Sequence, residues 1–359
     1  MEQLNILIEE SKKSYPIYFE EDFMRLPIVL KEKKIANKVL IVTDSNISPI
    51  YGEQLKELLE SCGVETYLFV FKAGEKSKNL DTIESIYEQC LKHRLDRTST
   101  LIALGGGVTG DIAGFAASTF MRGIHFVQVP TSLLAQVDSS VGGKVGVDYC
   151  GSKNIIGSFY QPELVYTNVN TLKTLPEREF LAGLAEVIKH GMIFDYDFFV
   201  YLEEKAQDIL ELKADALKYL VKKNCCIKAQ VVQQDEKEQG LRAILNFGHT
   251  FGHAIESSMN FSLLHGECVA IGMALACKLA YTKKMITYEE FMRLVNLLKL
   301  YKLPTEIKGV DPDKIYEEML RDKKQMNNKL KFILPTGIGK VIQTTDVTKE
   351  EIIESFKDG

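Results

Sequence analysis

The chain contains 359 residues, of which 45% are hydrophobic and 26% are charged, a composition typical of soluble globular proteins. This length exceeds that of most single hydrophobic cores, so two domains are expected. The formal net charge of -5 provides no general attraction to nucleic acid or to an anionic membrane, so neither is predicted as a partner.

The start of the sequence and its cysteines indicate where the chain works. The first residues lack the basic and apolar stretches of a signal peptide, and no apolar run reaches membrane-spanning length. The seven cysteines are an odd number and form no Cys-x-x-Cys pair. They are interpreted as reduced thiols, and a cytoplasmic location is expected.

The first half of the sequence alternates between strand-like and helix-like stretches. Residues 5–8 and 15–18 are possible edge strands. Apolar, β-branched runs predict strands at 38–44, 64–71, 99–104 and 125–129, and helical periodicity predicts helices at 50–62, 79–93 and 112–120. This alternation predicts an α/β domain with a doubly wound, mostly parallel sheet.

The second half is mainly helical in pattern. Helical periodicity occurs at 177–193, 195–211, 213–234, 242–258, 265–284, 287–300 and 311–321, and residues 331–335 are a short strand candidate. We therefore expect an α/β domain over residues 1–176 and a mainly α-helical domain over residues 177–359.

A glycine-rich segment, Gly105-Gly106-Gly107-Val108-Thr109-Gly110-Asp111, follows the strand predicted at 99–104. Backbone N–H groups at the start of the next helix can bind phosphate where no Cβ atom is in the way. The spacing differs from the Gly-x-Gly-x-x-Gly fingerprint, and a tight turn without a ligand is the alternative. Asp44, which ends an earlier strand, is a candidate for binding ribose hydroxyls or for capping the next turn.

Three of the six histidines lie between residues 249 and 265. His249 and His253 are four residues apart, so a helix places them on one face, and His265 follows after a polar break. Such imidazoles and one carboxylate can hold Zn²⁺ with an open coordination position, whereas a hydrogen-bonded histidine pair is the alternative. Glu186 is the best carboxylate, although Glu186 and Lys189 could instead form an ordinary surface ion pair.

Three glycines accompany these histidines: Gly248, Gly252 and Gly266. Each of them lowers helix stability. Their presence therefore suggests that another group approaches the backbone closely at these points.

Several charged residues interrupt otherwise apolar stretches. Lysine and arginine side chains that converge on a buried site usually bind phosphate or carboxylate. A small anionic molecule is therefore the expected substrate. The residues are Arg122, Asp138, Lys144, Lys153, Glu186, Lys189, Lys228 and Arg242.

Six motifs follow one another along most of the chain, and together they resemble the 3-dehydroquinate synthase family. The resemblance implies an NAD-binding α/β domain followed by a helical domain that binds metal and substrate. The motifs are Gly106-Gly107-Val108-Thr109-Gly110-Asp111, Pro130-Thr131-Ser132, Asp138-Ser139-Ser140-Val141-Gly142-Gly143-Lys144, Ser152-Lys153-Asn154, Ala185-Glu186-Val187-Ile188-Lys189 and Leu245-Asn246-Phe247-Gly248-His249-Thr250-Phe251-Gly252-His253.

The same resemblance implies an activity. The family converts 3-deoxy-D-arabino-heptulosonate 7-phosphate to 3-dehydroquinate and phosphate in the shikimate pathway, with NAD that is reduced only transiently. The chain is therefore expected to be a carbon–oxygen lyase with a small-molecule substrate and to form a homodimer. The implied metal ion, Zn²⁺ or Co²⁺, is held by Glu186, His249 and His265.

The resemblance also assigns cofactor, substrate and catalytic residues. One departure is Ala73, where many relatives have aspartate, and Lys323 is an alternative to Lys324. The residues implied to contact NAD are Asp44, Gly74, Glu75, Lys76, Ser77, Lys78, Gly107, Val108, Thr109, Gly110, Asp111, Thr131, Ser132, Lys153, Thr171, Leu172, Lys173 and Thr174. Those implied to bind substrate are Arg122, Lys144, Asn154, Lys189, Lys228, Arg242, Asn246 and Lys324, and the polar catalytic positions are Asp138, Lys144, Lys189, Glu238 and His253.

Three other functions are weighed against this one. Another sugar-phosphate cyclase, such as one that makes 2-deoxy-scyllo-inosose, would share NAD and zinc but not a substrate carboxylate. We expect Arg242 to hold that carboxylate, since a guanidinium suits bidentate binding; a solvated residue at a helix start is the alternative. A polyol dehydrogenase would release NADH, and a nucleotide-binding regulator would not need the metal ligands.

Overall fold

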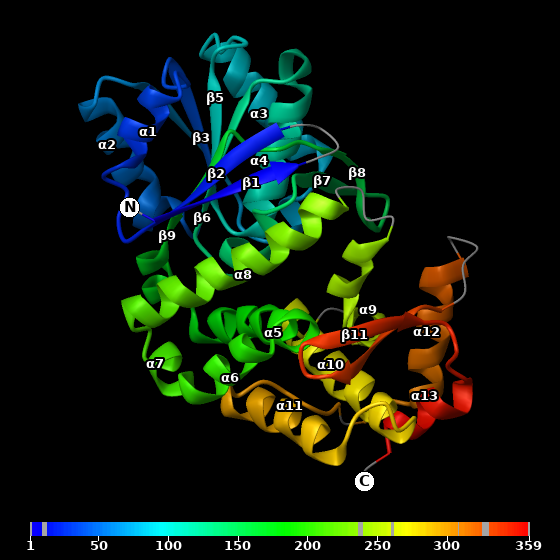
Figure 1. Cartoon of the computed structure of the whole chain (residues 1–359). Helices are drawn as coiled ribbons and strands as arrows, with labels where there is room; N and C mark the ends of the chain where they lie inside the picture. Colours follow the sequence, from blue (N-terminus) through cyan, green and yellow to red (C-terminus); the bar gives the residue numbers. More distant parts are fainter. Residues whose placement is uncertain are drawn as a thin grey trace. The chain divides into compact units, whose positions relative to one another are not determined.

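The computed structural model forms two compact units, Met1–Leu175 and Pro176–Gly359 (Figure 1). It describes residues 2–8, 13–235, 240–259, 262–307, 309–324 and 330–357. Within these residues, no helix combines the length and the apolar character that crossing a membrane requires.

The first unit is built around a seven-stranded sheet. Only β1 runs antiparallel to its neighbour β2, and the remaining pairs are parallel. The prediction of a mostly parallel, doubly wound sheet is confirmed. In sheet order the strands are β1 (Glu2–Ile8), β2 (Lys13–Glu20), β9 (Leu164–Asn168), β6 (His125–Pro130), β5 (Thr100–Gly105), β3 (Lys38–Asp44) and β4 (Glu65–Phe71).

Helices cover both faces of this sheet, which explains why its central strands are apolar throughout. On β3, Val39 and Ile41 pack with helices α1 (Leu26–Glu32) and α2 (Glu53–Ser61). Leu40 and Val42 point to the other face, which packs with α3 (Leu80–Lys92), α4 (Gly107–Thr119) and the hairpin of β7 (Lys144–Tyr149) and β8 (Ser152–Phe159). Short helical turns complete the unit: η1 (Ser48–Gly52), η2 (Glu75–Ser77), η3 (Phe120–Arg122), η4 (Ala135–Ser139) and η5 (Val169–Thr174).

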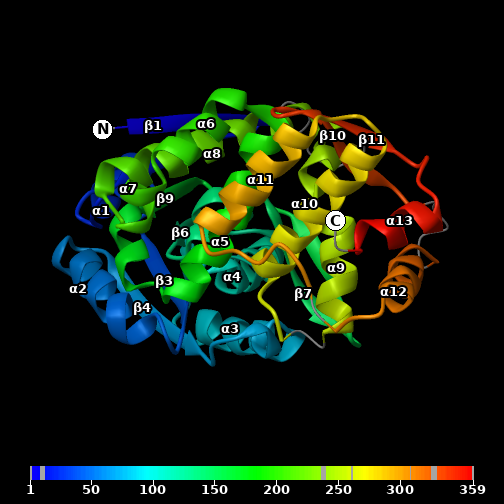
Figure 2. The ribbon, with the colours of Figure 1, turned by 90° about the horizontal axis from the view of Figure 1, so that it is seen from below.

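The second unit is mainly helical, as predicted. Helix α10 is its core: it is buried on nearly all sides and contacts α5, α9, α11, α13 and β10, and Figure 2 shows it between α9 and α11. The elements are α5 (Glu177–Phe194), α6 (Tyr196–Glu204), α7 (Ala206–Leu210), α8 (Ala214–Gln234), η6 (Leu241–Asn246), α9 (His249–Ser258), α10 (His265–Thr282), α11 (Tyr288–Leu300), α12 (Pro312–Lys324), β10 (Phe332–Gly337), β11 (Lys340–Thr344) and α13 (Lys349–Ser355).

The prediction of a single helix over residues 242–258 is wrong. The chain forms the 3₁₀ turn η6 and then the separate helix α9, with Gly248 between them in the left-handed region at φ 79°. A Cβ atom on Gly248 would lie 2.9 Å from the Val269 carbonyl oxygen of α10. Glycine is therefore required here both by the backbone conformation and by the nearby helix.

Other differences are smaller. The stretch 195–211 is two helices rather than one, and β2 is paired on both sides and is not an edge strand. Helix α4 begins at Gly107, five residues before the predicted start. The elements α1, β7, β8, β9, β11 and α13 were not predicted. The strand β8 is largely exposed, so it lacks the apolar alternation of a half-buried strand.

Candidate functional site

The predicted cofactor residues of the first unit gather at one edge of the sheet. Apart from Lys153 on β8, they lie at the carboxyl ends of five neighbouring parallel strands: Asp44 ends β3, residues 74–78 follow β4, residues 107–111 follow β5, Thr131 and Ser132 follow β6, and residues 171–174 follow β9. The chain leaves β3 toward β4 and leaves β5 toward β6 on the other side. The gap between β3 and β5 is thus a topological switch point, the usual place for ligands in such sheets.

The glycine-rich turn forms a shallow cradle at this edge. Gly106 precedes α4 and Gly107 begins it. A Cβ atom on Gly107 would lie 3.2 Å from Ser139 Oγ, and one on Gly106 would lie 3.4 Å from Ser132 Oγ. Side chains at these positions would crowd the two serine hydroxyls beside the helix N-terminus, where a pyrophosphate can accept hydrogen bonds from backbone N–H groups. The residues present therefore fit a dinucleotide.

Asp44 caps the turn that follows β3. Its Oδ1 accepts hydrogen bonds from the backbone N–H groups of Asn46, at 2.8 Å, and Ile47, at 3.2 Å. Its Oδ2 accepts a hydrogen bond of 3.3 Å from Thr109 Oγ1 on the first turn of α4. The capping interpretation is confirmed, and the role of Asp44 toward ribose stays a prediction.

A buried lysine connects three of the predicted segments. Lys78 Nζ lies 2.6 Å from Asp111 Oδ2 and also donates a hydrogen bond to Asn154 Oδ1 on β8. Burial raises the pKa of Asp111 to about 6, although the charge of Lys78 acts in the opposite direction. The three residues hold the segment after β4, the start of α4 and the hairpin in a fixed arrangement.

The remaining predicted residues of the first unit differ in exposure. Thr131, Thr171 and Leu172 are buried, so a cofactor contact there would come mainly from the backbone. Thr174 Oγ1 lies 2.7 Å from the hydroxyl of Tyr51. The remaining charged candidates lie on other elements: Arg122 is exposed in η3, Asp138 is half-buried in η4, Lys144 begins β7, and Lys153 is the second residue of β8.

In the second unit, Glu186 of α5, His249 of α9 and His265 of α10 come together. Glu186 Oε1 lies 3.5 Å from the Nε2 atoms of both His249 and His265. The ligand atoms of the three side chains all lie within 4.8 Å of one another. The other oxygen, Oε2, forms an ion pair with Lys189. Glu186 and Lys189 are only 1% and 2% exposed, so their interpretation as a surface ion pair is wrong.

The distances among these atoms suit a divalent metal. Zinc bonds of about 2.0–2.1 Å in a tetrahedral site place neighbouring ligand atoms about 3.3–3.4 Å apart. The two separations of 3.5 Å are close to that edge length. His249 Nδ1 lies 3.1 Å from the Phe247 carbonyl oxygen, and when Nδ1 carries the proton, the lone pair of Nε2 faces Glu186. The donor set therefore fits a zinc-type metal ion.

The charged groups of the cluster shift one another's pKa values. Burial, aided by Lys189, lowers the pKa of His249 to about 3, so this imidazole is neutral. Burial alone would raise the pKa of Glu186, but Lys189 and the two histidines hold it well below its usual value. Burial lowers the pKa of His265 as well, but Glu186 and Glu256 outweigh it and raise this pKa to about 9. A metal ion that binds here must displace a proton from His265.

Other predicted residues of the second unit lie near this cluster or elsewhere in the same unit. The ring centroid of His253 lies 5.3 Å from that of His249 and 5.9 Å from that of His265. Lys228 of α8 is buried and Asn246 ends η6. Glu238 lies outside the described residues, and Lys324 ends α12 with a side chain that also lies outside them.

Arg242 is buried, with 3% of its surface exposed, so its interpretation as a solvated residue is wrong. Its backbone N–H donates a 2.9 Å hydrogen bond to Asp235 Oδ2, which also accepts from the N–H of Gly240 at 2.8 Å. Asp235 was not predicted. No N-cap signal identifies it, because its bonds to Gly240 and Arg242 span five and seven residues, whereas an N-cap side chain bonds the N–H two or three residues ahead.

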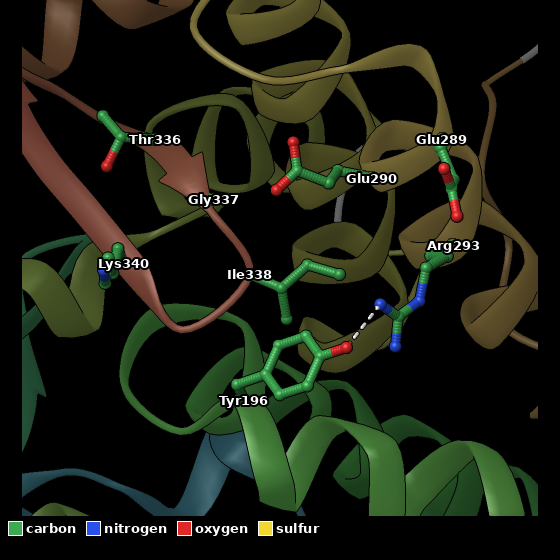
Figure 3. A pocket seen from close by; sticks show the side chains of 8 residues that line it. All are labelled: Tyr196, Glu289, Glu290, Arg293, Thr336, Gly337, Ile338 and Lys340. Carbon is green, nitrogen blue, oxygen red and sulfur yellow. Dashed lines mark hydrogen bonds between the residues drawn. The ribbon is translucent and has the colours of Figure 1, made fainter.

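A cavity of about 430 Å³ on the second unit is separate from these residues (Figure 3). Its eight lining residues include none of the predicted site residues. Its arginine, Arg293, donates a 3.2 Å hydrogen bond to the hydroxyl of Tyr196 and pairs with Glu203 at 2.6 Å. The charge of Arg293 is thus already neutralised by the protein.

Comparison with known proteins identifies the family. Models of the N-terminal and C-terminal parts of 3-dehydroquinate synthase match residues 68–182 and 183–325. The chain belongs to the 3-dehydroquinate synthase family. A 3-dehydroquinate synthase of Acetivibrio thermocellus is 52% identical over 355 residues, which cover 99% of this chain and 98% of the relative.

Solved structures of sugar-phosphate cyclases have a similar fold. A 2-epi-5-epi-valiolone synthase from Streptomyces hygroscopicus, with NAD⁺ and Zn²⁺ bound, is 29% identical and has a TM-score of 0.88 over 96% of both chains. A 2-deoxy-scyllo-inosose synthase complexed with carbaglucose-6-phosphate, NAD⁺ and Co²⁺ is 25% identical and has a TM-score of 0.86 over 99% of both chains.

Proposed function

We propose that this chain converts 3-deoxy-D-arabino-heptulosonate 7-phosphate to 3-dehydroquinate and phosphate in the shikimate pathway. The observation that carries this choice is the 52% identity with a 3-dehydroquinate synthase over 99% of the chain. Because the reaction has no net oxidation and eliminates phosphate, the chain would be a carbon–oxygen lyase.

In this proposal the two units have different tasks. The carboxyl edge of the sheet in the first unit binds NAD, with the pyrophosphate at the N-terminus of α4. Glu186, His249 and His265 hold the metal ion in the second unit. The cyclases of similar fold with NAD⁺ and Zn²⁺ or Co²⁺ bound support both assignments.

The substrate passes through several reactions in one site. When bound, NAD⁺ accepts and returns a hydride, and the metal ion lowers the pKa of a substrate hydroxyl. Between the two hydride transfers the new ketone acidifies the adjacent C–H bond, and phosphate leaves by elimination. The ring then opens, and an aldol closure forms the carbocycle.

The protein's own residues bind and orient the substrate during these steps. The buried guanidinium of Arg242 can form a bidentate pair with the substrate carboxylate. The ammonium groups of Lys189 and Lys228 stabilise negative charge, and they are buried, where such interactions are stronger than in water. Holding one flexible intermediate through this sequence requires many oriented contacts, which accounts for the number of buried cations.

A phosphate-release assay tests this function. Purified chain is given the heptulosonate phosphate with and without added NAD and Zn²⁺ or Co²⁺, and both phosphate and NADH are measured. We expect phosphate to accumulate without a matching rise in NADH. Stoichiometric NADH would indicate a dehydrogenase, no phosphate would indicate a regulator, and turnover of glucose 6-phosphate instead would indicate another cyclase.

Two further parts of the proposal concern the oligomeric state and the cellular location of the chain. The family resemblance suggests a homodimer, which sedimentation equilibrium would measure. It also suggests a cytoplasmic location, which cell fractionation would test.

A further inference from the structure

His265 is the first residue of its helix, α10, as His249 is of α9, whereas Glu186 lies in the middle of α5. A residue at a helix end is held less firmly by its own helix than one in the middle. The orientation of this imidazole therefore depends on contacts from neighbouring elements.

One of these contacts comes from Glu256. This residue lies on α9 seven positions after His249, so two helical turns place both side chains on the same face. Its Oε2 lies 3.4 Å from His265 Nδ1, while His265 Nε2 lies 3.5 Å from Glu186 Oε1. The imidazole of His265 thus bridges two carboxylates, one at each ring nitrogen.

The surroundings of Glu256 favour a specific role for its charge. The residue is buried, with 9% of its surface exposed, and burying an ionised carboxylate is costly unless charged or hydrogen-bonding groups compensate. A carboxylate that accepts the second N–H of a metal-bound histidine fixes its tautomer and its ring orientation. His249 has an equivalent partner in the Phe247 carbonyl oxygen.

We infer that Glu256 is a positioning residue for the metal site. Its carboxylate accepts the Nδ1–H of His265 and directs the Nε2 lone pair toward the point shared with Glu186 and His249. This inference rests on the proposed metal site, and it adds a residue outside the ligand set.

Another carboxylate, Glu267 on α10, provides a matched control. Glu267 forms two hydrogen bonds with Arg178 of α5, of 2.8 and 2.7 Å, and accepts the backbone N–H of Leu264 at 2.8 Å. It supports the first turn of α10, and no bond between it and an imidazole is found among the described residues. Glutamine at this position can still cap the helix. Glu267→Gln therefore measures general loosening of the turn without removing the partner of His265.

The test measures metal affinity, independently of turnover. Full-length wild type, Glu256→Gln, Glu256→Ala and Glu267→Gln are stripped with a chelator and titrated with Co²⁺ against a competing chelator, with the ligand-field spectrum recorded. We expect Glu256→Ala to lose about 10- to 100-fold in affinity. Glu256→Gln should lose less and show an altered spectrum, while Glu267→Gln should stay within about twofold of wild type.

Thermal melting of the metal-free proteins shows whether each variant is folded. If Glu256→Ala does not fold, the Co²⁺ affinity of Glu256→Gln tests the role of Glu256. The inference is overturned if the Glu256 variants bind Co²⁺ as wild type does, or if Glu267→Gln loses as much affinity as Glu256→Gln. Wild type that binds no Co²⁺ would overturn the metal site itself. Failure to release phosphate with normal Co²⁺ binding would overturn only the proposed reaction.

Discussion

Replacing Gly266 by alanine would force two helices apart beside the candidate metal ligands. A Cβ atom at this position would lie 1.9 Å from the carbonyl oxygen of Ala182 and 2.6 Å from its carbonyl carbon. These are backbone atoms of α5, so no side-chain rotation can relieve the overlap. The helices would have to separate by about 1 Å, and overpacking of this kind typically costs about 1–3 kcal/mol.

The loss of folding free energy can be converted into a change in melting temperature. Alanine is favoured over glycine inside a helix by about 1 kcal/mol, which offsets part of the overpacking cost. Because the overlap is with backbone atoms, the overpacking cost lies in the upper part of its range, about 2–3 kcal/mol. The net loss of about 1–2 kcal/mol lowers the melting temperature of a unit of this size by about 2–8 °C. Because Gly266 follows His265 and Ala182 lies one turn before Glu186, bound metal should also decrease.

The assay is thermal unfolding by circular dichroism, together with elemental analysis of the purified protein. Gly191→Ala on α5 is the control, because its Cβ atom would lie 3.3 Å from the Phe199 backbone, and a shift of a few tenths of an ångström relieves that contact. This variant should melt close to wild type. The reasoning is refuted if Gly266→Ala melts like wild type and keeps its full metal content.

Three further predictions concern the two candidate sites. His249→Ala should lose most bound metal in elemental analysis but retain NAD binding; full metal occupancy would contradict the ligand assignment. The pKa of Asp111 is raised from 3.8 to about 6, so its contribution to stability is present below pH 3.8 and is lost as the pH rises through about 6. Asp111→Asn should therefore flatten the pH dependence of the melting temperature over this range, and an unchanged profile would count against the raised pKa. Arg242→Lys should lower kcat/KM at least about tenfold, or about 1.4 kcal/mol, with NAD affinity and metal content near wild type; unchanged kcat/KM would mean that the carboxylate is held elsewhere.

The sequence predicts most of the sheet because several of its strands are continuous apolar or β-branched runs, although the short buried strand β9 was missed. The strand β3 has the predicted bounds, since Lys38 and Asp44 enclose five consecutive apolar or β-branched residues. The hairpin strand β8 could not be predicted in this way, because Ser152–Phe159 is largely exposed and alternates weakly. Its position depends on contacts with distant residues, such as the bond from Lys78 to Asn154.

Part of the candidate metal site could likewise be predicted from the sequence, and part could not. The spacing of His249 and His253 and the apolar surroundings of Glu186 indicate candidate ligands, because these are properties of the local sequence. The choice of His265 over His253 comes from the family resemblance. The contribution of Glu256 could not be predicted, since it depends on how α9 meets the start of α10. An isolated glutamate on a helix has the same local pattern whether it faces solvent or an imidazole.

The glycines near the histidines connect the fold to the proposed chemistry. They were interpreted as places where another group approaches the backbone, and the structure shows that this group is a neighbouring helix. A Cβ atom on Gly272 of α10 would lie 2.0 Å from the carbonyl oxygen of Gly248, the residue before His249. A side chain at Gly272 would therefore move α10 away from the start of α9 and separate the histidines that these helices carry. In this chain the close approach of α9 and α10 at Gly248 and Gly272 therefore keeps His249 and His265 where the Nε2 atoms of both lie 3.5 Å from Glu186 Oε1.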